Sequence, residues 1–325
     1  MSIDRRSLLA LTIGGVGAGL ALPNQITAQA AAPTAGKQAP GIYRYKVGGY
    51  EVTAISDGGA SRKLDETFVR NVPLADVQKD LQASFQPKDQ VRITFTTLAI
   101  NTGSKVIVLD TGYGDGGPAS AGSMAASLAA AGIDPANVDM VVHSHFHPDH
   151  IAGTRRKDGS LTYPKAEIKV PAPEWDFWMD DAKMAQAPEG MKGNFQLVRT
   201  VFGPNAKDIT RFEWEKEVAP GITAIAAPGH TPGHTAFMIQ SGNAKLLVAS
   251  DCTNAAFLNL RNPEWKLVFD MDPDLAIATR KRFFDMASSE RAQVAAYHWP
   301  FPAVGHVVKD GTRYQLVPTN WNPVL

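Results

Sequence analysis

The sequence contains a single cysteine, Cys252, so no disulfide can form within one molecule. It also lacks an excess of charge, because Lys and Arg together number 32 and Asp and Glu together number 32. A neutral chain has no basic surface for nucleic acid. These absences predict a fold that depends on its core, and a small, mostly uncharged molecule as its partner. Cys252 itself is expected to be a buried small residue, with a catalytic thiol as the alternative.

No apolar run reaches the roughly 20 residues that a membrane-spanning helix needs. The longest candidate follows paired arginines at positions 5 and 6: residues 7–22 are apolar but interrupted by glycines, and residues 28–30 (Ala-Gln-Ala) offer a cleavage site. This order is typical of an export signal, and the arginine pair resembles the twin-arginine type. We therefore expect residues 1–30 to be a signal peptide, with an uncleaved anchor as the alternative. The mature protein would be periplasmic or secreted, without a membrane segment.

The rest of the sequence alternates short β-type runs with helical stretches, and neither a repeat nor a linker divides it. We expect an α/β (α+β) fold in one domain, residues 41–325, after a flexible leader at residues 31–40. The expected strands are at 51–56, 105–110, 138–143, 166–170, 222–226, 235–240, 244–249 and 293–297. The expected helices are at 124–131, near 174–183, and from Asp272-Pro273 to about Ser288.

Histidine is concentrated in three clusters. The eight histidines are His143, His145, His147, His150, His230, His234, His298 and His306. In the segment His145-x-His147-x-Asp149-His150, the first two histidines are two residues apart and can bind one ion from an extended chain. Asp149 and His150 follow where the chain turns, so they face a neighbouring position. Four imidazole and carboxylate ligands in six residues predict two adjacent divalent metal ions, with zinc the best match.

The second cluster lies between two predicted strands, in a turn whose glycines and prolines fix a tight bend at residues 228–235. Either His230 or His234 could bind metal. His230 is preferred because it comes first after the strand, whereas His234 is expected to support a ligand or to pack. His143 lies within a strand and is expected to be structural.

Three more polar residues directly follow apolar strands. Asp251 would be costly to bury without a partner, and a bridge between two cations removes that cost, whereas an exposed turn is the alternative. His298 ends its strand in the same way, with His306 as the alternative ligand. Asp110 is expected either to orient a ligating histidine or to cap the turn after it.

These residues resemble the metallo-β-lactamase superfamily, in the HxHxDH motif, the Asp-Thr-Gly after a strand, the Gly-His turn, the later aspartate and the last histidine. Residues 39–44 with 55–58, 229–235 and 298–306 more closely resemble the branch of methyl parathion hydrolase and related exported lactonases and esterases. The resemblance implies a four-layer αββα sandwich and suggests a homodimer. It also implies one metal site from His145, His147 and His230, a second from Asp149, His150 and His298, and Asp251 as the bridge.

The ligands and the resemblance predict a hydrolase of a small ester or lactone, such as an acyl-homoserine lactone. Two divalent ions, zinc above all, would share a hydroxide that attacks the substrate. Asp149, which would also hold the proton of that hydroxide, and Asp251 are the predicted catalytic residues. The alternatives are phosphotriester hydrolysis, an iron-dependent redox protein, and metal binding without activity. Oxygen-reducing diiron members carry glutamate where this chain has His147, which argues against the redox alternative.

The sequence constrains the substrate pocket less than the metal site. The phosphotriesterase of the branch has an aromatic residue in the loop after Asp-Thr-Gly, whereas glycine stands at that place in loop 113–117 of this chain. This difference argues against an organophosphate substrate. Trp178, Phe195 and Trp299 are expected to line the pocket, with core packing as the alternative for Trp178.

Overall fold

The computed structural model describes residues 34–118 and 120–325. The predicted signal peptide lies outside the described residues, and so does the start of the predicted leader. Residues 34–40 are exposed and contain neither helix nor strand, and residues 39–325 form one compact unit. No helix in the described parts of the chain is both long and apolar enough to cross a membrane.

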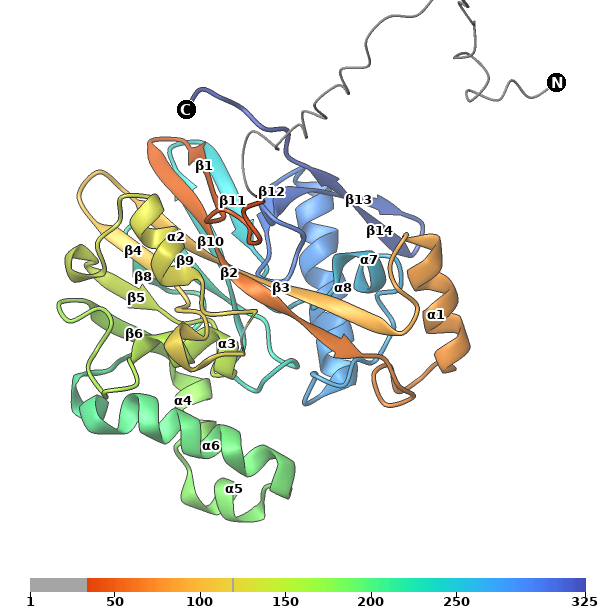
Figure 1. The fold of residues 1–325 in the computed structure, drawn as a ribbon, viewed down its shortest axis with the longest axis horizontal. Helices are drawn as coiled ribbons and strands as arrows, with labels where there is room; N and C mark the ends of the chain where they lie inside the picture. The colour runs from red at the N-terminus through yellow and green to blue at the C-terminus, as the bar shows by residue number, and fades with distance from the viewer. Residues whose placement is uncertain (1–33, 119) are drawn as a thin grey trace, which may run out of the picture. The chain divides into compact units, whose positions relative to one another are not determined.

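Two seven-stranded sheets form the centre of this unit (Figure 1). The first sheet follows chain order: β1 (Ile42–Val47), β2 (Tyr50–Lys63), β3 (Gln90–Asn101), β4 (Val106–Leu109), β5 (Met140–Val142), β6 (Glu167–Pro171) and β7 (Thr210–Phe212). The second has the order β14 (Arg313–Pro318), β13 (Val304–Asp310), β12 (Gln293–Ala295), β11 (Ala244–Val248), β10 (Thr235–Ser241), β9 (Ile222–Ala226) and β8 (Glu217–Ala219). Neighbouring strands run parallel from β4 to β7 and between β11 and β12. All other neighbouring strands in the two sheets run antiparallel.

The two sheets pack face to face because alternate residues of their strands are apolar. Ile107 and Leu109 of β4 share one buried core with Phe237 of β10 and Leu246 of β11. Side chains alternate between the two faces of a strand, so Val108 points to the opposite side and joins a different core. Both faces of the central strands are therefore buried, which requires another layer outside each sheet.

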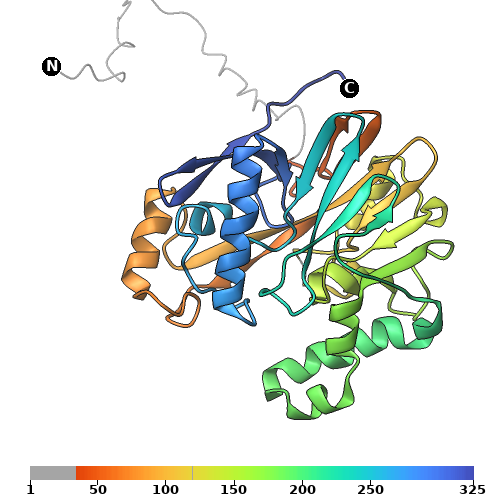
Figure 2. The ribbon, with the colours of Figure 1, turned by 180° about the vertical axis from the view of Figure 1, so that it is seen from behind.

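Helices provide these outer layers. They are α1 (Leu74–Ala83), α2 (Met124–Ala130), α3 (Pro148–Ile151), α4 (Ala172–Trp178), α5 (Asp181–Gln186), α6 (Glu189–Phe202), α7 (Ala256–Asn259) and α8 (Pro273–Ser289). Met124 and Leu128 of α2 pack on the first sheet, and Phe284 of α8 packs on the second. The view from behind shows α8 lying across the second sheet (Figure 2). The predicted αββα layer order is confirmed.

The strand pairing brings the polar strand ends to one region. β4 and β5 are parallel, so Asp110 and the segment that begins at His143 leave the first sheet at the same edge. β11 and β12 are also parallel, which places the chain after Val248 and the chain after Ala295 at one edge of the second sheet. The β9–β10 hairpin turns at that edge, since β10 is antiparallel to both neighbours.

The first turn of α8 is fixed to this same region. Asp272 caps the helix by accepting a hydrogen bond from the Leu275 amide at 3.0 Å, as its sequence signal predicts. Its own amide donates to the carbonyl of Gly229 at 2.9 Å. Gly229 has a φ of 125°, and a Cβ at this position would lie 2.3 Å from the amide nitrogen of Ala276. Only glycine therefore lets the helix approach the turn so closely.

Candidate metal centre

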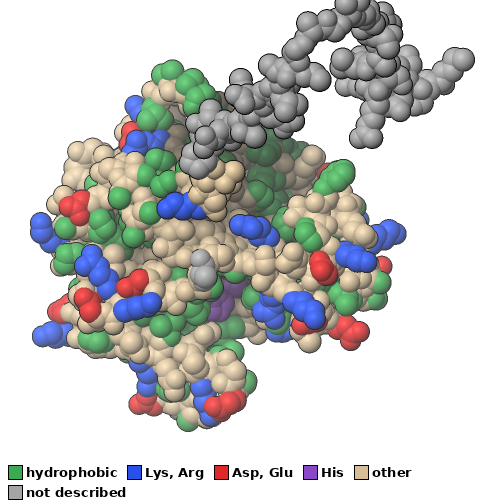
Figure 3. Space-filling model, viewed as in Figure 1, with side chains coloured by type: hydrophobic (Ala, Val, Ile, Leu, Met, Phe, Trp, Pro, Cys, Tyr) green, Lys and Arg blue, Asp and Glu red, His purple; other side chains and the backbone are tan. Residues whose placement is uncertain are grey.

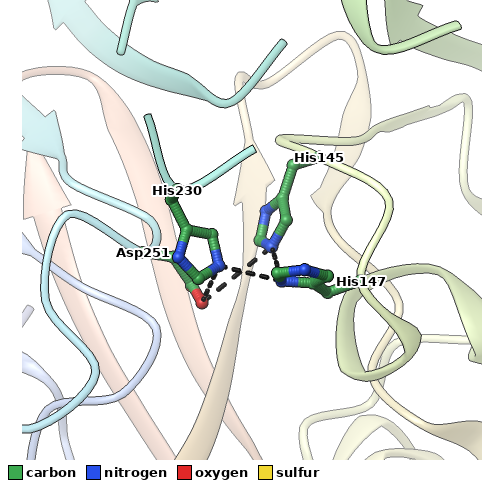
Figure 4. A group of neighbouring side chains, drawn as sticks. All are labelled: His145, His147, His230 and Asp251. Atoms are coloured by element: carbon green, nitrogen blue, oxygen red, sulfur yellow. Dashed lines mark hydrogen bonds and ion pairs between the residues drawn. The ribbon is translucent and has the colours of Figure 1, made fainter. Parts of the chain in front are cut away.

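The structure brings the seven predicted ligands together in two adjoining groups. His145, His147, His230 and Asp251 form the first ligand group, and their side chains point toward one another (Figure 4). Asp149, His150 and His298 form the second ligand group. Within each group the donor atoms lie within 4.8 Å of one another. The first sheet contributes the ligands from the segment 145–150, and the second sheet contributes the other three.

Asp251 lies between the two ligand groups. Its Oδ2 is 3.2 Å from Nε2 of His230 in the first group and 2.8 Å from Nε2 of His298 in the second. Its Oδ1 is 3.2 Å from Nε2 of His150. Each carboxylate oxygen therefore faces the second group while Oδ2 also reaches the first, which is the placement that a bridging ligand requires.

The chemistry of these atoms fits divalent cations. Nε2 of His150 and Oδ1 of Asp251 are buried and have no hydrogen-bond partner among the described residues. Burial lowers the pKa of His147 to about 3, so its imidazole is neutral at pH 7. Neutral imidazole is the form that binds metal, and buried polar atoms without partners are costly unless a ligand satisfies them. The residues fit two ions of the kind that nitrogen and carboxylate donors bind, zinc among them.

Asp110 supports His150, as predicted. Its Oδ2 lies 2.8 Å from Nδ1 of His150, and its two oxygens accept hydrogen bonds from the amide and the hydroxyl of Ser144 at 2.8 and 2.7 Å. A carboxylate in this position holds the imidazole ring so that Nε2 faces the ligand group.

His234 supports the bridge instead of joining either ligand group. Its Nδ1 donates to the carbonyl of Ala227 at 2.7 Å, and its Nε2 accepts the amide hydrogen of Asp251 at 3.0 Å. Burial lowers the pKa of His234 to about 4, which keeps Nε2 free to accept. The side chain thereby fixes the backbone that carries Asp251.

The last two histidines of the chain occupy different surroundings. Nδ1 of His298 donates to the carbonyl of Thr94 at 2.8 Å, which turns its Nε2 toward Asp251. His306 is exposed on β13 and lies outside both ligand groups.

His143 is buried, with Nε2 3.2 Å from the hydroxyl of Thr154, as befits a structural residue.

Alanine variants of His298 and His306 should therefore differ in metal content. His298→Ala is expected to leave about one bound ion per chain, because the second ligand group loses a donor, whereas His306→Ala should keep two. Metal analysis of both purified proteins gives the stoichiometry, and a circular dichroism spectrum checks that each is folded. Metal loss in His306→Ala alone would mean that the ligand groups described above are wrong.

A buried carboxylate–arginine pair behind His230 was not predicted. Nδ1 of His230 lies 3.0 Å from Oδ1 of Asp270, whose Oδ2 pairs with Arg280 at 3.1 Å. The Arg280 side chain is fully buried on α8, where it also donates to the carbonyl of Cys252 at 2.7 Å. The Arg280 guanidinium therefore holds two features in place. These are the Asp270 carboxylate, which orients His230, and the loop that follows Asp251.

Asp270→Asn is expected to weaken binding of the ion at the first ligand group by about 10- to 100-fold, the usual effect of removing a carboxylate that orients a ligating histidine. Competition with a chromogenic zinc chelator measures this affinity directly. Asp274→Asn is the matched control, because Asp274 lies four residues further along the chain, is exposed in the first turn of α8 and pairs with Lys266. Equal zinc affinity in the two variants would contradict the orienting role of Asp270.

Glu174 is a second buried carboxylate that the sequence did not reveal. Oε1 accepts from the amide of Phe146 at 2.9 Å and from the indole of Trp178 at 2.8 Å. Oε2 accepts from the hydroxyl of Thr231 at 2.9 Å and from the amide of Gly233 at 2.7 Å. Burial raises the pKa of Glu174, and the four donors oppose this shift. Glu174 thereby ties the loop of His145 and His147 to the turn of His230.

A cavity of about 980 Å³ opens over both ligand groups, with His147, Asp149, His230, Asp251 and His298 in its wall. On the corresponding face of the molecule, histidine side chains are visible in a hollow (Figure 3). The wall includes Trp178, although this residue is almost wholly buried and bonds Glu174. The wall also contains the apolar side chains of Ile93, Phe95, Met191, Val268, Phe269 and Met271 and the polar side chains of Ser61, Arg62, Arg70, Asn194 and Asn254.

Two of the predicted pocket residues do not line this cavity, and the prediction is wrong for them. Phe195 on α6 is fully buried behind Trp178, with 4.7 Å between their ring centroids. Trp299 is fully buried against Phe284 of α8, and its indole donates to Thr253. Both rings stabilise the layers of the fold, because a large apolar side chain gains most from complete burial.

Cys252 is buried beneath the site, and burial raises the pKa of its thiol to about 12. Such a thiol stays protonated at pH 7 and is a poor nucleophile. The side chain belongs to the core between the second sheet and α8. Its surroundings therefore agree with the expectation of a small buried residue.

A model of the metallo-β-lactamase superfamily matches residues 90–298, which is more than half of the chain. The chain belongs to the metallo-β-lactamase superfamily. The matched segment begins at the first residue of β3 and ends at His298, so it includes every residue of both ligand groups. Superfamily membership, predicted from the motifs, is confirmed.

Curated relatives of this superfamily member are similar over part of their length. An N-acyl homoserine lactonase from Bacillus thuringiensis is 25% identical over 164 residues, which are 49% of this chain and 55% of that protein. The N-acyl homoserine lactonase AttM of Agrobacterium fabrum (strain C58) is 29% identical over 126 residues, 37% of this chain and 43% of that protein. The chain thus spans about half the length of the curated relatives that it matches.

Solved structures of the superfamily are similar over most of the chain. AidC, described as a dizinc quorum-quenching lactonase in complex with a product, has a TM-score of 0.83 and 26% identity, and covers 88% of this chain and 100% of its own. The hydrolase AbOPH has a TM-score of 0.81 with the same identity and coverage. These relatives do not specifically support the predicted likeness to the methyl parathion hydrolase branch.

Proposed function

We propose that this protein is a metal-dependent hydrolase of lactones and related small esters that uses two divalent ions, most suitably zinc. The observation that carries the proposal is the position of Asp251 between two adjoining ligand groups at the base of a largely apolar cavity. Divalent ions bound there would polarise a carbonyl oxygen and lower the pKa of bound water from about 16 to near 7.

The chain's own residues would place the substrate and the reacting proton. Asp149 belongs to the second ligand group and also lines the cavity, so its carboxylate can accept a proton from attacking water. The apolar wall around Phe95 and Phe269 would exclude bulk water from the acyl part of the substrate. Exclusion of water strengthens the electrostatic interactions that stabilise the transition state.

The relatives favour a lactone over a phosphotriester. Both curated relatives are N-acyl homoserine lactonases, and AidC is described as a dizinc lactonase. An acyl-homoserine lactone combines a reactive carbonyl with an apolar chain, which matches a cavity whose base is polar and whose wall is apolar. Phosphotriester hydrolysis is the second candidate, because two adjoining ions also suit that reaction.

We also propose that the protein acts outside the cytoplasm, as the twin-arginine-type signal at residues 1–30 indicates. Export in the folded state would suit a site that must be loaded with metal before use. Fractionation of cells that produce the full chain, followed by N-terminal sequencing, tests both export and cleavage. Size-exclusion chromatography with light scattering on the same sample tests the proposed homodimer.

Activity and metal content should be measured on one preparation. We expect close to two ions per chain and turnover of N-octanoyl-homoserine lactone, with slower hydrolysis of an aryl ester and slower hydrolysis still of a phosphotriester. Fewer than two ions would contradict the dinuclear site. A phosphotriester rate above the lactone rate would reverse the order of the two candidate functions.

A further inference from the structure

We propose that the cavity is built for an acyl chain that ends in a carboxylate, and that Arg62 binds this end. The inference rests on the proposed function, since it assigns the far end of the same substrate. It also revises the expectation of a mostly uncharged substrate, because a protein without net charge can still carry a local positive charge in its cavity. The inference starts from the register of β2 and β3.

The β2–β3 pair forms a track that leads away from the metal centre. Gly58 pairs with Phe95, Ala60 with Ile93, and Arg62 with Val91. Residues two apart point to the same face, so Ala60, Arg62, Ile93 and Phe95 share one face, and all four line the cavity. The track therefore runs from an aromatic residue through small and apolar residues to a guanidinium.

The two ends of this track are fixed by contacts. At the inner end, the ring of Phe95 packs edge-on against His298, with 5.6 Å between centroids. The His298 ring is anchored to the carbonyl of Thr94, which follows Val91, the partner of Arg62, by three residues along β3. Three residues of β-strand span ~10 Å, which is the length of an extended chain of about eight carbons.

Two aromatic rings hold the Arg62 side chain in place. Its guanidinium lies 5.1 Å from the ring centroid of Phe269 and 5.9 Å from that of Phe68. These contacts are cation–π attractions, and the positive charge of the guanidinium can still attract a carboxylate. Among the described residues, no carboxylate forms an ion pair with Arg62. The Asp65 carboxylate, three residues on, accepts hydrogen bonds from the amide and the hydroxyl of Thr67, which lower its pKa more than the charge of Arg62 does.

Neighbouring residues make the outer end of the track both apolar and positive. Val268 and Phe269 form the wall beside Arg62. Arg70, a second arginine of the cavity wall, donates to the carbonyl of Val268 at 2.8 Å and so fixes that wall. An acyl chain with a methyl end would leave the Arg62 guanidinium without a carboxylate partner, whereas a terminal carboxylate would gain a charge-assisted hydrogen bond.

The test compares two ring-opened products that differ only at the chain end. Calorimetry on the zinc-loaded protein measures binding of N-octanoyl-homoserine and of its analogue with a carboxylate on the terminal carbon. We expect the analogue to bind about 10-fold more tightly, a typical gain for a partly exposed hydrogen bond between charged groups. Arg62→Gln should remove this preference. Lys63→Gln, which removes the same charge from the next residue, exposed at the end of β2, should preserve it.

Chain length provides the geometric control. An analogue with four carbons and a terminal carboxylate cannot reach Arg62, so it should bind no better than its methyl-ended counterpart. Equal binding of the two eight-carbon compounds, or an equal loss of preference in both variants, would overturn the assignment of Arg62. Turnover of the parent lactones is a separate readout. The expected binding preference without turnover would refute the proposed function and leave the assignment of Arg62 standing.

Discussion

Replacing Asp251 with asparagine is expected to lower lactone hydrolysis by about 10³-fold or more and to leave fewer than two ions per chain. The carboxylate faces both ligand groups, at 3.2 Å from Nε2 of His230 and 2.8 Å from Nε2 of His298. Asparagine keeps the volume but replaces one oxygen with an amide nitrogen that cannot bind a cation. Metal analysis and initial rates on the same sample measure the two effects.

The matched control for this variant is Asp310→Asn, which removes one carboxylate at an exposed position of the β13–β14 hairpin. This control should keep the activity and the metal content of the unmodified protein. A variant Asp251→Asn that hydrolyses lactone at the normal rate with two ions would show that the bridge is not needed. Normal activity with one ion would instead assign catalysis to a single metal.

Replacing Glu174 with alanine is expected to lower the free energy of unfolding by at least ~4 kcal/mol, because each buried group left without a partner costs about 1–3 kcal/mol. Four donors would lose their acceptor, and three of them, in Phe146, Thr231 and Gly233, belong to the loops that carry His147 and His230. Urea unfolding of the metal-free protein measures the effect without a contribution from bound ions.

Two variants show whether the effect comes from these hydrogen bonds. Glu174→Gln keeps one acceptor oxygen, so its loss of stability should be roughly half that of Glu174→Ala. Glu189→Ala removes a glutamate that is exposed at the start of α6 and should change the stability by less than ~0.5 kcal/mol. Similar unfolding free energies for Glu174→Ala and Glu189→Ala would mean that Glu174 does not hold the loops together.

The ligands could be predicted from the sequence because they follow local rules. Each lies just after an apolar strand or inside a short turn, and the periodicity of a strand is visible in a few residues. Strand β9 was predicted with its exact bounds, and α8 begins at the predicted proline. The cap at Asp272 is equally local, since its partner is three residues away.

The supporting carboxylates Asp270 and Glu174 could not be predicted, because neither directly follows a predicted strand and their partners are distant in the chain. Asp270 is 40 residues from His230, and Glu174 is 57 residues from Thr231. No spacing rule connects such pairs, and a single sequence gives no sign that a given carboxylate is buried. The pocket residues failed for a related reason: Trp299 and Trp178 have the same character, and only packing decides which one lies at the cavity.

Helix α6 was missed because its sequence is ambiguous. Gly190 and Gly193 disfavour helix, each by about 1 kcal/mol relative to alanine. The helix forms because Phe195, Val198 and Phe202 are spaced to face one core, which they share with Trp178. Packing against the rest of the molecule thus outweighs the local preference, which is a common reason for such failures.

The two ligand groups draw their side chains from both sheets, and this gives the ions a mechanical part in a protein whose one cysteine cannot cross-link it. An ion bound at either ligand group would link the first sheet to the second and would oppose their separation during unfolding. Chelators would then shorten the lifetime of the molecule in addition to stopping turnover. The lifetime of the folded protein would then depend on the supply of zinc around it.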